Sequence, residues 1–214
     1  MSPATVFVID DNQEHRNSLR FLLEAHKYKV EVFPSAESFF AVYDAERAGC
    51  VLIDLRLENG IDGLELWKRL QTRGYGIPGV LISGAAKVRE VREAFHSGML
   101  DFLEKPFDSP ALLACVDRCL TTDRERRAED AAIGAAKAVL DRLSDREREV
   151  ADCWADGLRT KETADRLNVS ARTIEHHIAR IKRRLEIDSA AEFVQLLVRA
   201  GQRPHGAELV RASN

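Results

Sequence analysis

The stretch Thr5-Val-Phe-Val-Ile9-Asp10-Asp11 decides the fold class of this 214-residue chain. Its first five residues are β-branched or aromatic, as in a buried strand, and two carboxylates follow directly. Four more strand-like runs follow, over residues 29–33, 50–54, 80–83 and 100–104. Amphipathic helical segments separate these runs, and the last of them covers residues 110–120. The alternation predicts a doubly wound α/β domain with a five-stranded parallel sheet.

Polar residues stand where these strands end. The first strand runs into Asp10 and Asp11, the third ends in Asp54, the fourth ends in Ser83, and the fifth leads into Lys105. In a doubly wound sheet the carboxyl ends of the strands hold the binding site. Carboxylates brought together repel one another unless a cation lies among them. Oxygen ligands of this kind suit Mg²⁺, which usually also touches a phosphate, so we expect a phosphoryl-binding site with Mg²⁺ as cofactor.

From residue 143 onward the pattern is all-helical. Ser144 with Glu147 three residues later is a capping box, and the helix that follows stops near Gly157. Thr160 is expected to cap a short second helix, and Ser170 caps a third that runs over residues 171–185. A fourth helix covers residues 190–198. Two short helices, the second of them basic and exposed, are typical of a helix-turn-helix that places one helix in the DNA major groove.

Charge and composition divide the chain further. Residues 1–122 carry 14 Lys and Arg against 18 Asp and Glu, whereas residues 142–214 carry 14 against 12. An acidic front and a locally basic back favour different partners for the two ends. The four cysteines form no CxxC pair, and no apolar run approaches the roughly 20 residues that cross a bilayer. We therefore expect a cytoplasmic protein without membrane contact.

The residues Asp10-Asp11, Asp54, Ser83 and Lys105-Pro106 together resemble the signature of a bacterial response-regulator receiver domain, which is a flavodoxin-like fold. The resemblance implies that Asp54 accepts a phosphoryl group from a sensor histidine kinase. It also implies that Asp11 binds Mg²⁺ directly and Asp10 through water, and that Ser83 and Lys105 contact the phosphoryl oxygens.

Three further features follow from the same resemblance. Asp54 and the backbone carbonyl of Arg56 complete the Mg²⁺ ligands, Phe102 occupies the place of the aromatic switch, and the Lys105-Pro106 bond is cis. The loop after Asp54 departs from the family pattern. Family members that share the Asp-x-Arg opening usually continue Met-Pro-Gly-x-x-Gly, whereas residues 57–63 lack the proline and are one residue longer. We expect this loop to affect the dephosphorylation rate and the choice of kinase.

Residues 143–199 resemble the LuxR-type helix-turn-helix of the NarL/FixJ regulators, in the runs 143–150, 157–164 and 170–177. By position, Glu175, His176 and Ala179 would face base edges. A second set would meet phosphates, which position the protein but carry no sequence information. This set consists of Lys161, Arg172, Thr173, Arg180 and Arg183.

These expectations give four segments: a receiver domain (residues 1–122), a helical linker (123–142), a DNA-binding domain (143–200) and a flexible tail (201–214). The implied protein is no enzyme but a transcriptional regulator controlled by phosphorylation. The phosphoryl group would alter the surface around residues 88–119, favour a homodimer, and lead to binding of promoter DNA and RNA polymerase. One alternative is a regulator that no longer uses phosphate and keeps the receiver for dimerisation or partner binding. Another is an Mg²⁺-dependent phosphatase, which leaves the C-terminal helices unexplained.

Overall fold

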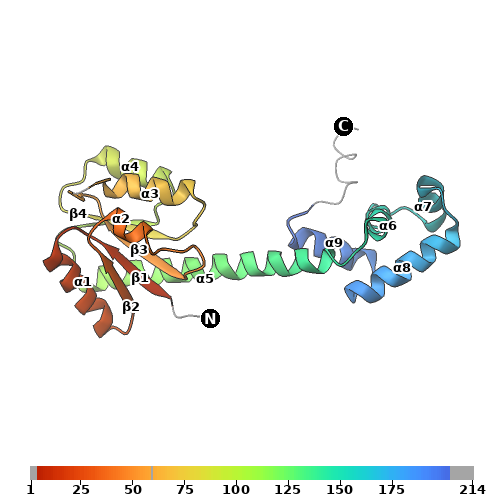
Figure 1. Cartoon of the computed structure of the whole chain (residues 1–214), viewed down its shortest axis with the longest axis horizontal. Coiled ribbons are helices and arrows are strands. Elements are labelled where there is room, and N and C mark those ends of the chain that lie inside the picture. Colours follow the sequence, from red (N-terminus) through yellow and green to blue (C-terminus); the bar gives the residue numbers. More distant parts are fainter. Residues whose placement is uncertain (1–3, 59, 203–214) are drawn as a thin grey trace. The chain divides into compact units, whose positions relative to one another are not determined.

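The computed structural model describes residues 4–58 and 60–202 (Figure 1). The chain divides into two compact units, Met1–Arg127 and Ala128–Asn214, which we call the N-terminal and C-terminal units. Among the described residues, none of the helices combines the length and the apolar character that crossing a membrane requires.

The N-terminal unit is built on a sheet of five parallel strands in the order β2-β1-β3-β4-β5. Their bounds are β1 (Thr5–Ile9), β2 (Lys29–Phe33), β3 (Gly49–Asp54), β4 (Gly79–Ser83) and β5 (Asp101–Glu104). The central strand β1 pairs on both sides, so that Ile9 lies opposite Phe33 of β2 and Ile53 of β3. The predicted doubly wound parallel sheet is confirmed.

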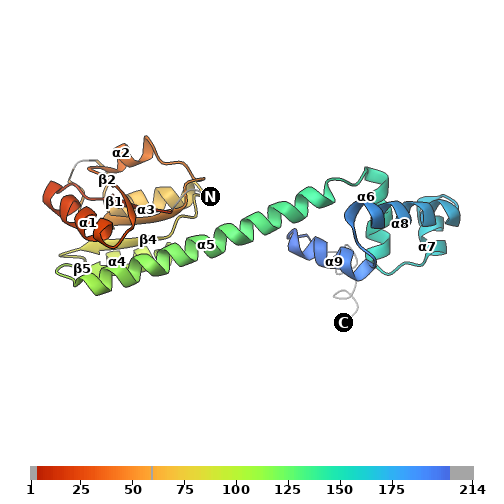
Figure 2. The ribbon, with the colours of Figure 1, turned by 90° about the horizontal axis from the view of Figure 1, so that it is seen from below.

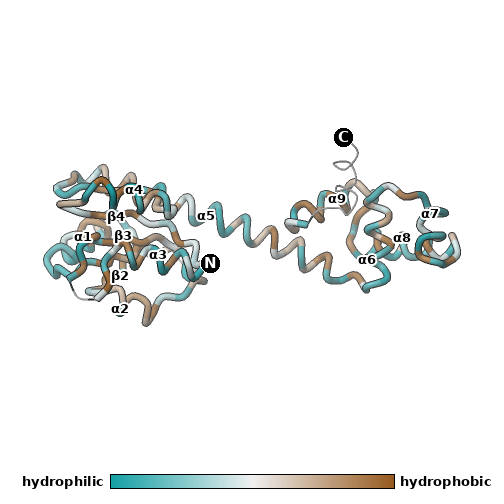
Figure 3. Tube along the Cα trace, turned by 90° about the horizontal axis from the view of Figure 1, so that it is seen from above, coloured by the Kyte–Doolittle hydropathy of each residue, from teal (hydrophilic) through white to brown (hydrophobic). Residues whose placement is uncertain are grey.

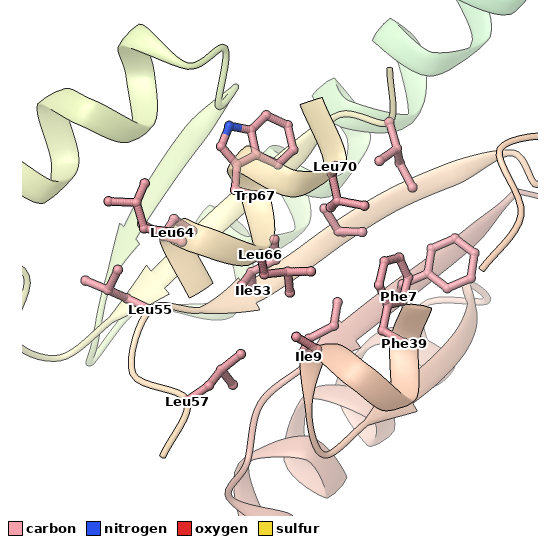
Figure 4. Close-up of a cluster of buried hydrophobic side chains, with 14 of the residues drawn as sticks. Phe7, Ile9, Phe39, Ile53, Leu55, Leu57, Leu64, Leu66, Trp67 and Leu70 are labelled. Carbon is pink, nitrogen blue, oxygen red and sulfur yellow. The ribbon is translucent and has the colours of Figure 1, made fainter. Parts of the chain in front are cut away.

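Helices cover both faces of this sheet (Figure 1). They are α1 (Gln13–Ala25), α2 (Ala36–Phe40), α3 (Gly63–Thr72), α4 (Val88–His96) and α5 (Ser109–Leu140). Successive strand residues point to opposite faces, so β1 contributes Phe7 to one hydrophobic cluster and Val8 to another. The first cluster includes residues of α2, α3 and α4, with Trp67 and Phe39 fully buried (Figure 4). The second includes residues of α1 and α5.

Helix α5 is longer than the sequence pattern suggested. The pattern predicts one helix over residues 110–120 and a separate helical linker over 123–142, whereas the structure has one uninterrupted helix of 32 residues (Figure 2). Its interior contains no proline, and its only glycine, Gly134, is exposed. Nothing in the local sequence therefore breaks the helix, and the division between the two units falls within it, after Arg127.

The C-terminal unit adds four shorter helices to the end of α5. They are α6 (Asp145–Ala155), α7 (Thr160–Leu167), α8 (Ala171–Leu185) and α9 (Ala190–Arg199). Their apolar faces enclose a core that includes Val150, Ile174, Ile181 and Phe193. Brown and teal alternate along these helices in Figure 3, as expected of helices with one face in a core and one in water.

Two of the three helix starts expected in this unit are confirmed, and one is wrong. Ser144 and Glu147 form the capping box of α6, and the Ser170 hydroxyl accepts from the Thr173 N–H at the start of α8. Thr160 is not a cap. It is the first residue of α7, and the N-cap is Arg159. The Glu162 carboxylate accepts from the Arg159 backbone N–H at 2.7 Å. Most of the expected tail, residues 203–214, lies outside the described residues.

Candidate functional site

The carboxyl edge of the sheet gathers side chains from four strands. Backbone hydrogen bonds continue the parallel ladder past the strand ends: the Asp10 N–H donates to Phe33 O at 3.2 Å, and the Lys105 N–H donates to Ser83 O at 2.8 Å. These bonds fix the backbone from which the polar side chains project. The chain past β5 then turns through a cis bond between Lys105 and Pro106.

The ammonium of Lys105 lies among three acceptors at this edge. Its Nζ is 2.5 Å from Oδ2 of Asp54, 3.2 Å from Oδ2 of Asp10 and 3.4 Å from Nδ1 of His15. The two carboxylates come from β3 and the end of β1, which are neighbours in the sheet. Asp54 and Asp10 precede Lys105 by 51 and 95 positions in the chain, and the fold brings the three side chains together. The sequence predicted this grouping.

Both carboxylates are oriented by backbone donors. The Asn12 N–H donates to Oδ1 of Asp10 at 2.8 Å, and the Arg56 N–H donates to Oδ1 of Asp54 at 2.9 Å. Each of these carboxylates therefore keeps its second oxygen directed toward Lys105. The Asp54 side chain is 10% exposed, which leaves it reachable from solvent, whereas that of Asp10 is 3% exposed.

Burial and charge oppose one another at this site. Burial raises the pKa of Asp10 above its ordinary value, and the charge of Asp54 adds to this, although the Asn12 N–H and Lys105 act in the opposite direction. Burial by itself lowers the pKa of Lys105, but the hydrogen bond and charge of Asp54, together with Asp10, outweigh it, so this pKa is raised. The site therefore holds more negative charge than one ammonium neutralises.

Three further residues expected at the site, Asp11, Ser83 and Phe102, make contacts with other groups. The Asp11 carboxylate accepts from the Glu58 N–H at 2.9 Å, in the loop that departs from the family pattern. Ser83 is fully buried, and its hydroxyl accepts from the Ala85 N–H at 3.2 Å. Phe102 is partly buried against the first hydrophobic cluster.

Arg56 reaches away from the cluster. Its guanidinium pairs with Glu90 at 2.8 Å and donates to the Ala85 carbonyl at 3.3 Å. The Glu90 carboxylate also accepts from the Lys87 N–H at 2.7 Å, at the start of α4. Arg56 thus links the loop after Asp54 to the first turn of α4.

His15 is the site residue that the sequence reasoning missed, since a lone histidine there is most simply a surface residue. It is the third residue of α1, and its side chain is 51% exposed. Its Nδ1 lies 3.6 Å from Asp10 Oδ2. Among the described residues, Asp10, His15 and Asp54 each direct one possible metal-ligand atom to the same place, with these atoms within 4.8 Å of one another. Its position just after the acidic pair, on the first turn of a helix, was the available signal.

The donor chemistry at this edge fits Mg²⁺. Asp10, Asp11 and Asp54 supply carboxylate oxygens, which this ion prefers. The backbone carbonyl of Arg56 follows Asp54 by two residues in the same loop. The residues expected from the sequence as ligands are therefore compatible with the ion.

In the C-terminal unit, helix α8 presents polar side chains to solvent while its apolar residues enter the core. Seven of the eight expected DNA-contacting residues are exposed, and Thr173 is half-buried. The exposed ones are Lys161, Arg172, Glu175, His176, Ala179, Arg180 and Arg183. The Thr173 hydroxyl forms a 2.7 Å hydrogen bond with that of Ser170, so this side chain also takes part in the start of the helix.

Some basic residues of α8 have partners within the unit. Arg180 Nε lies 3.5 Å from Oε1 of Glu147, and Arg184 pairs with the other oxygen of the same carboxylate at 2.6 Å. Lys182 lies over the ring of Trp154, 5.5 Å from its centroid. Arg172 and Arg183 form no ion pair with any residue that the structure describes, so they present the least compensated positive charge of α8.

A parallel sheet with acidic residues and a lysine at its carboxyl edge, followed by a helix-turn-helix, defines a two-component response regulator of the DNA-binding class. Comparison with known families agrees: residues 6–117 match the response regulator receiver domain, and residues 141–197 match the luxR family of bacterial regulatory proteins. The chain belongs to the response regulators of the NarL/FixJ type, which are transcriptional regulators and not enzymes.

Individual relatives match over nearly the whole chain. The transcriptional regulatory protein FixJ of Azorhizobium caulinodans is 38% identical over 93% of this chain and 94% of its own length. FixJ of Bradyrhizobium diazoefficiens is 34% identical over 92% of this chain and 95% of its own. Among solved structures, the response regulator StyR is 32% identical with a TM-score of 0.81, covering 92% of this chain and 98% of that one. Full-length FixJ from B. japonicum is 33% identical with a TM-score of 0.57, covering 94% and 98%.

Proposed function

We propose that this regulator is switched by phosphorylation of Asp54 by a sensor histidine kinase. The observation that carries the proposal is the Asp54 carboxylate itself. It is held by the Arg56 N–H, lies 2.5 Å from the Lys105 ammonium and is 10% exposed. A carboxylate that is fixed in position, faces a cation and remains reachable is suited to attack an incoming phosphorus atom.

In the proposed reaction an oxygen of Asp54 forms a bond to phosphorus while the phosphorus–nitrogen bond of the kinase phosphohistidine breaks. The product is an acyl phosphate, and the histidine leaves with the bonding electron pair. Lys105 would hold a phosphoryl oxygen, and Ser83 would bind another after its hydroxyl leaves the Ala85 N–H. When bound by Asp10, Asp11, Asp54 and the carbonyl of Arg56, Mg²⁺ would neutralise the negative charge that the transfer brings together.

The added group carries nearly two negative charges at neutral pH, which is enough to bias a two-state element. We expect movement of Ser83 and Lys105 toward it to change the packing of Phe102 and the surface formed by α4, β5 and α5. This surface would then form a homodimer, so that two C-terminal units bind promoter DNA together and meet RNA polymerase. We place these events in the cytoplasm.

Within the DNA-binding unit, Glu175, His176 and Ala179 are proposed to face base edges. Lys161, Arg172, Thr173, Arg180 and Arg183 are proposed to meet phosphates. Exposure of most of these side chains on α7 and α8 supports the assignment. Arg180 also lies 3.5 Å from Glu147, so in this proposal it would serve both an internal ion pair and DNA.

The test is incubation of the full chain with Mg²⁺ and acetyl phosphate, followed by intact-mass measurement. Wild type should gain the mass of one phosphoryl group, and Asp54→Ala should gain none. Asp44→Ala, which removes an exposed carboxylate from the same unit, is the matched control and should behave as wild type. A wild type without mass gain that still binds DNA would instead support the phosphate-independent alternative, in which the receiver serves for dimerisation or partner binding.

A further inference from the structure

Asp123 is a buried carboxylate that the proposed reaction does not use. It lies on α5 at the end of the N-terminal unit and is 2% exposed. Its Oδ2 accepts from the backbone N–H of Gly49 at 2.9 Å and from Nε of Arg127 at 2.9 Å, and its Oδ1 accepts from Nη2 of Arg126 at 2.9 Å. A charge this deeply buried is stable only when it is paired and hydrogen-bonded, and here both oxygens are.

Arg127 extends the same network to three backbone carbonyls. Its guanidinium donates to the carbonyl of Ala45 at 2.8 Å, to that of Arg47 at 2.7 Å and to that of Glu46 at 3.3 Å. These carbonyls belong to the segment between α2 and β3. We call the set Asp123, Arg127, Gly49 and residues 45–47 the α5 clamp. Residues 123–127, which the sequence pattern assigns to the linker, are thereby fastened to the receiver fold.

The α5 clamp acts at one end of the strand that carries the proposed phosphoacceptor at its other end. Gly49 is the first residue of β3 and Asp54 is the last, and all six residues of the strand are buried. Gly49 is also tightly enclosed by the neighbouring strand β1, because a Cβ there would lie 1.9 Å from the Thr5 carbonyl oxygen. The Asp123 carboxylate thus bonds the helix directly to the backbone N–H at the start of the strand.

We propose that the α5 clamp makes the start of the linker helix a fixed part of the receiver, so that a change at Asp54 alters DNA binding through α5. If a helix frays where it leaves its domain, a displacement within that domain is only weakly transmitted along the helix. A helix fixed to the domain by buried charge-assisted hydrogen bonds moves together with it. The inference rests on the proposed phosphorylation of Asp54. It concerns how the state of the receiver reaches the C-terminal unit, and Asp123 and Arg127 are positioning residues in it.

The test uses the full chain with Arg127→Gln, which removes the three carbonyl contacts and the ion pair with Asp123. Arg124→Gln removes the same charge from an exposed position on the same helix and is the matched control. Amide hydrogen exchange over residues 121–130 should become at least tenfold faster in Arg127→Gln and change less than twofold in the control. Unchanged exchange in Arg127→Gln would show that there is no clamp.

Coupling is measured with a DNA duplex selected from a random-sequence library by wild type treated with acetyl phosphate and Mg²⁺. The readout is the ratio of DNA affinities with and without acetyl phosphate, alongside the mass gain at Asp54. Arg127→Gln should keep the mass gain and lose most of the affinity ratio, by threefold or more relative to wild type. Faster exchange with an unchanged affinity ratio would overturn the role in coupling.

If wild type gains no phosphoryl mass, the proposed function fails, while the exchange measurement still decides whether the clamp exists. If Arg127→Gln does not fold, Asp123→Asn replaces it, because its amide oxygen still accepts from Gly49 while the charge facing Arg127 is lost. The same two readouts are expected, and a wild-type result in both would refute the proposal.

Discussion

Oε2 of Glu147 lies 2.6 Å from Nη1 of Arg184, which follows it by 37 residues. The same carboxylate accepts from the Ser144 N–H at 3.0 Å, and its other oxygen lies 3.5 Å from Arg180 Nε. One buried side chain thus caps α6 and pairs with the last turns of α8. This carboxylate therefore joins the start of α6 to the proposed DNA-reading helix.

Glu147→Gln should destabilise the C-terminal unit by about 2 kcal/mol, because hydrogen bonds to charged groups contribute about 1.5–3 kcal/mol each and the two arginines remain partly solvated. Calorimetric unfolding of the full chain measures this. Glu149→Gln is the control, since its carboxylate is 54% exposed and pairs with Arg146 on the surface, at 2.6 Å. It should lower stability by less than about 0.5 kcal/mol, and an equal loss in both variants would contradict the role given to Glu147.

The contribution of Glu147 should depend on pH. The hydrogen bond from the Ser144 backbone N–H, with the charges of Arg184 and Arg180, holds the pKa of this carboxyl below its ordinary value. A carboxyl whose pKa is lower in the folded chain stabilises it above the unfolded pKa, about 4.3, and this is lost as the pH falls through the folded pKa. The stability difference between wild type and Glu147→Gln should therefore be constant near neutrality and shrink below about pH 4. A difference that grows on acidification would show the opposite sign.

Gly63→Ala should disturb the proposed phosphoacceptor. A Cβ at this position would lie 2.2 Å from the carbonyl oxygen of Asp54, so either the loop or the end of β3 must move. We expect at least tenfold slower phosphorylation by acetyl phosphate, since a misplacement of about 1 Å is enough for a large loss. Gly134→Ala is the control, because a Cβ there meets nothing within 4 Å. Equal phosphorylation rates in the two variants would show that the close packing of Gly63 against the Asp54 carbonyl does not matter for phosphorylation.

Lys105→Met should separate ion binding from phosphorylation. The ammonium lies 2.5 Å from Asp54 and 3.2 Å from Asp10, where it partly neutralises the carboxylates proposed to hold Mg²⁺. Without it, the affinity for the ion should rise by about threefold to tenfold, because a nearby like charge is removed. Phosphorylation should slow, because a phosphoryl oxygen loses its partner. Calorimetric Mg²⁺ titration and intact mass measure the two effects, and weaker Mg²⁺ binding would contradict this geometry.

The proposed DNA contacts predict two kinds of effect from substitutions. Arg172→Ala should weaken binding to all sequences and reduce the slope of log affinity against log salt by about one, as loss of one phosphate contact does. His176→Ala should change the preferred sequence and leave that slope unchanged, if it faces a base edge. Fluorescence anisotropy of labelled duplexes over a series of salt concentrations gives both quantities. Identical salt slopes for wild type and Arg172→Ala would remove Arg172 from the phosphate set.

Much of the fold was readable from local sequence. Hydrophobic periodicity and helix caps depend on residues a few positions apart. They predicted where the strands lie along the chain, the division into an α/β unit and an all-helical unit, and the bounds of α8. The cap of α7 was not readable, because the carboxylate of Glu162 takes the place of the expected hydroxyl of Thr160. The sequence pattern predicted two helical segments where the structure has the single helix α5, because composition does not show whether two neighbouring helical segments are continuous.

The sequence by itself determined which residue types stand at the carboxyl ends of the strands, because a strand carries its own periodicity and ends at a definable residue. Tertiary structure alone decided that His15 lies beside Lys105, that Arg180 and Arg184 share Glu147, and that Asp123 is bonded to Gly49. These contacts join residues that lie 33 to 90 positions apart in the chain but are adjacent in space. Their distances depend on how the helices pack on the sheet and on one another, and no local pattern records that packing.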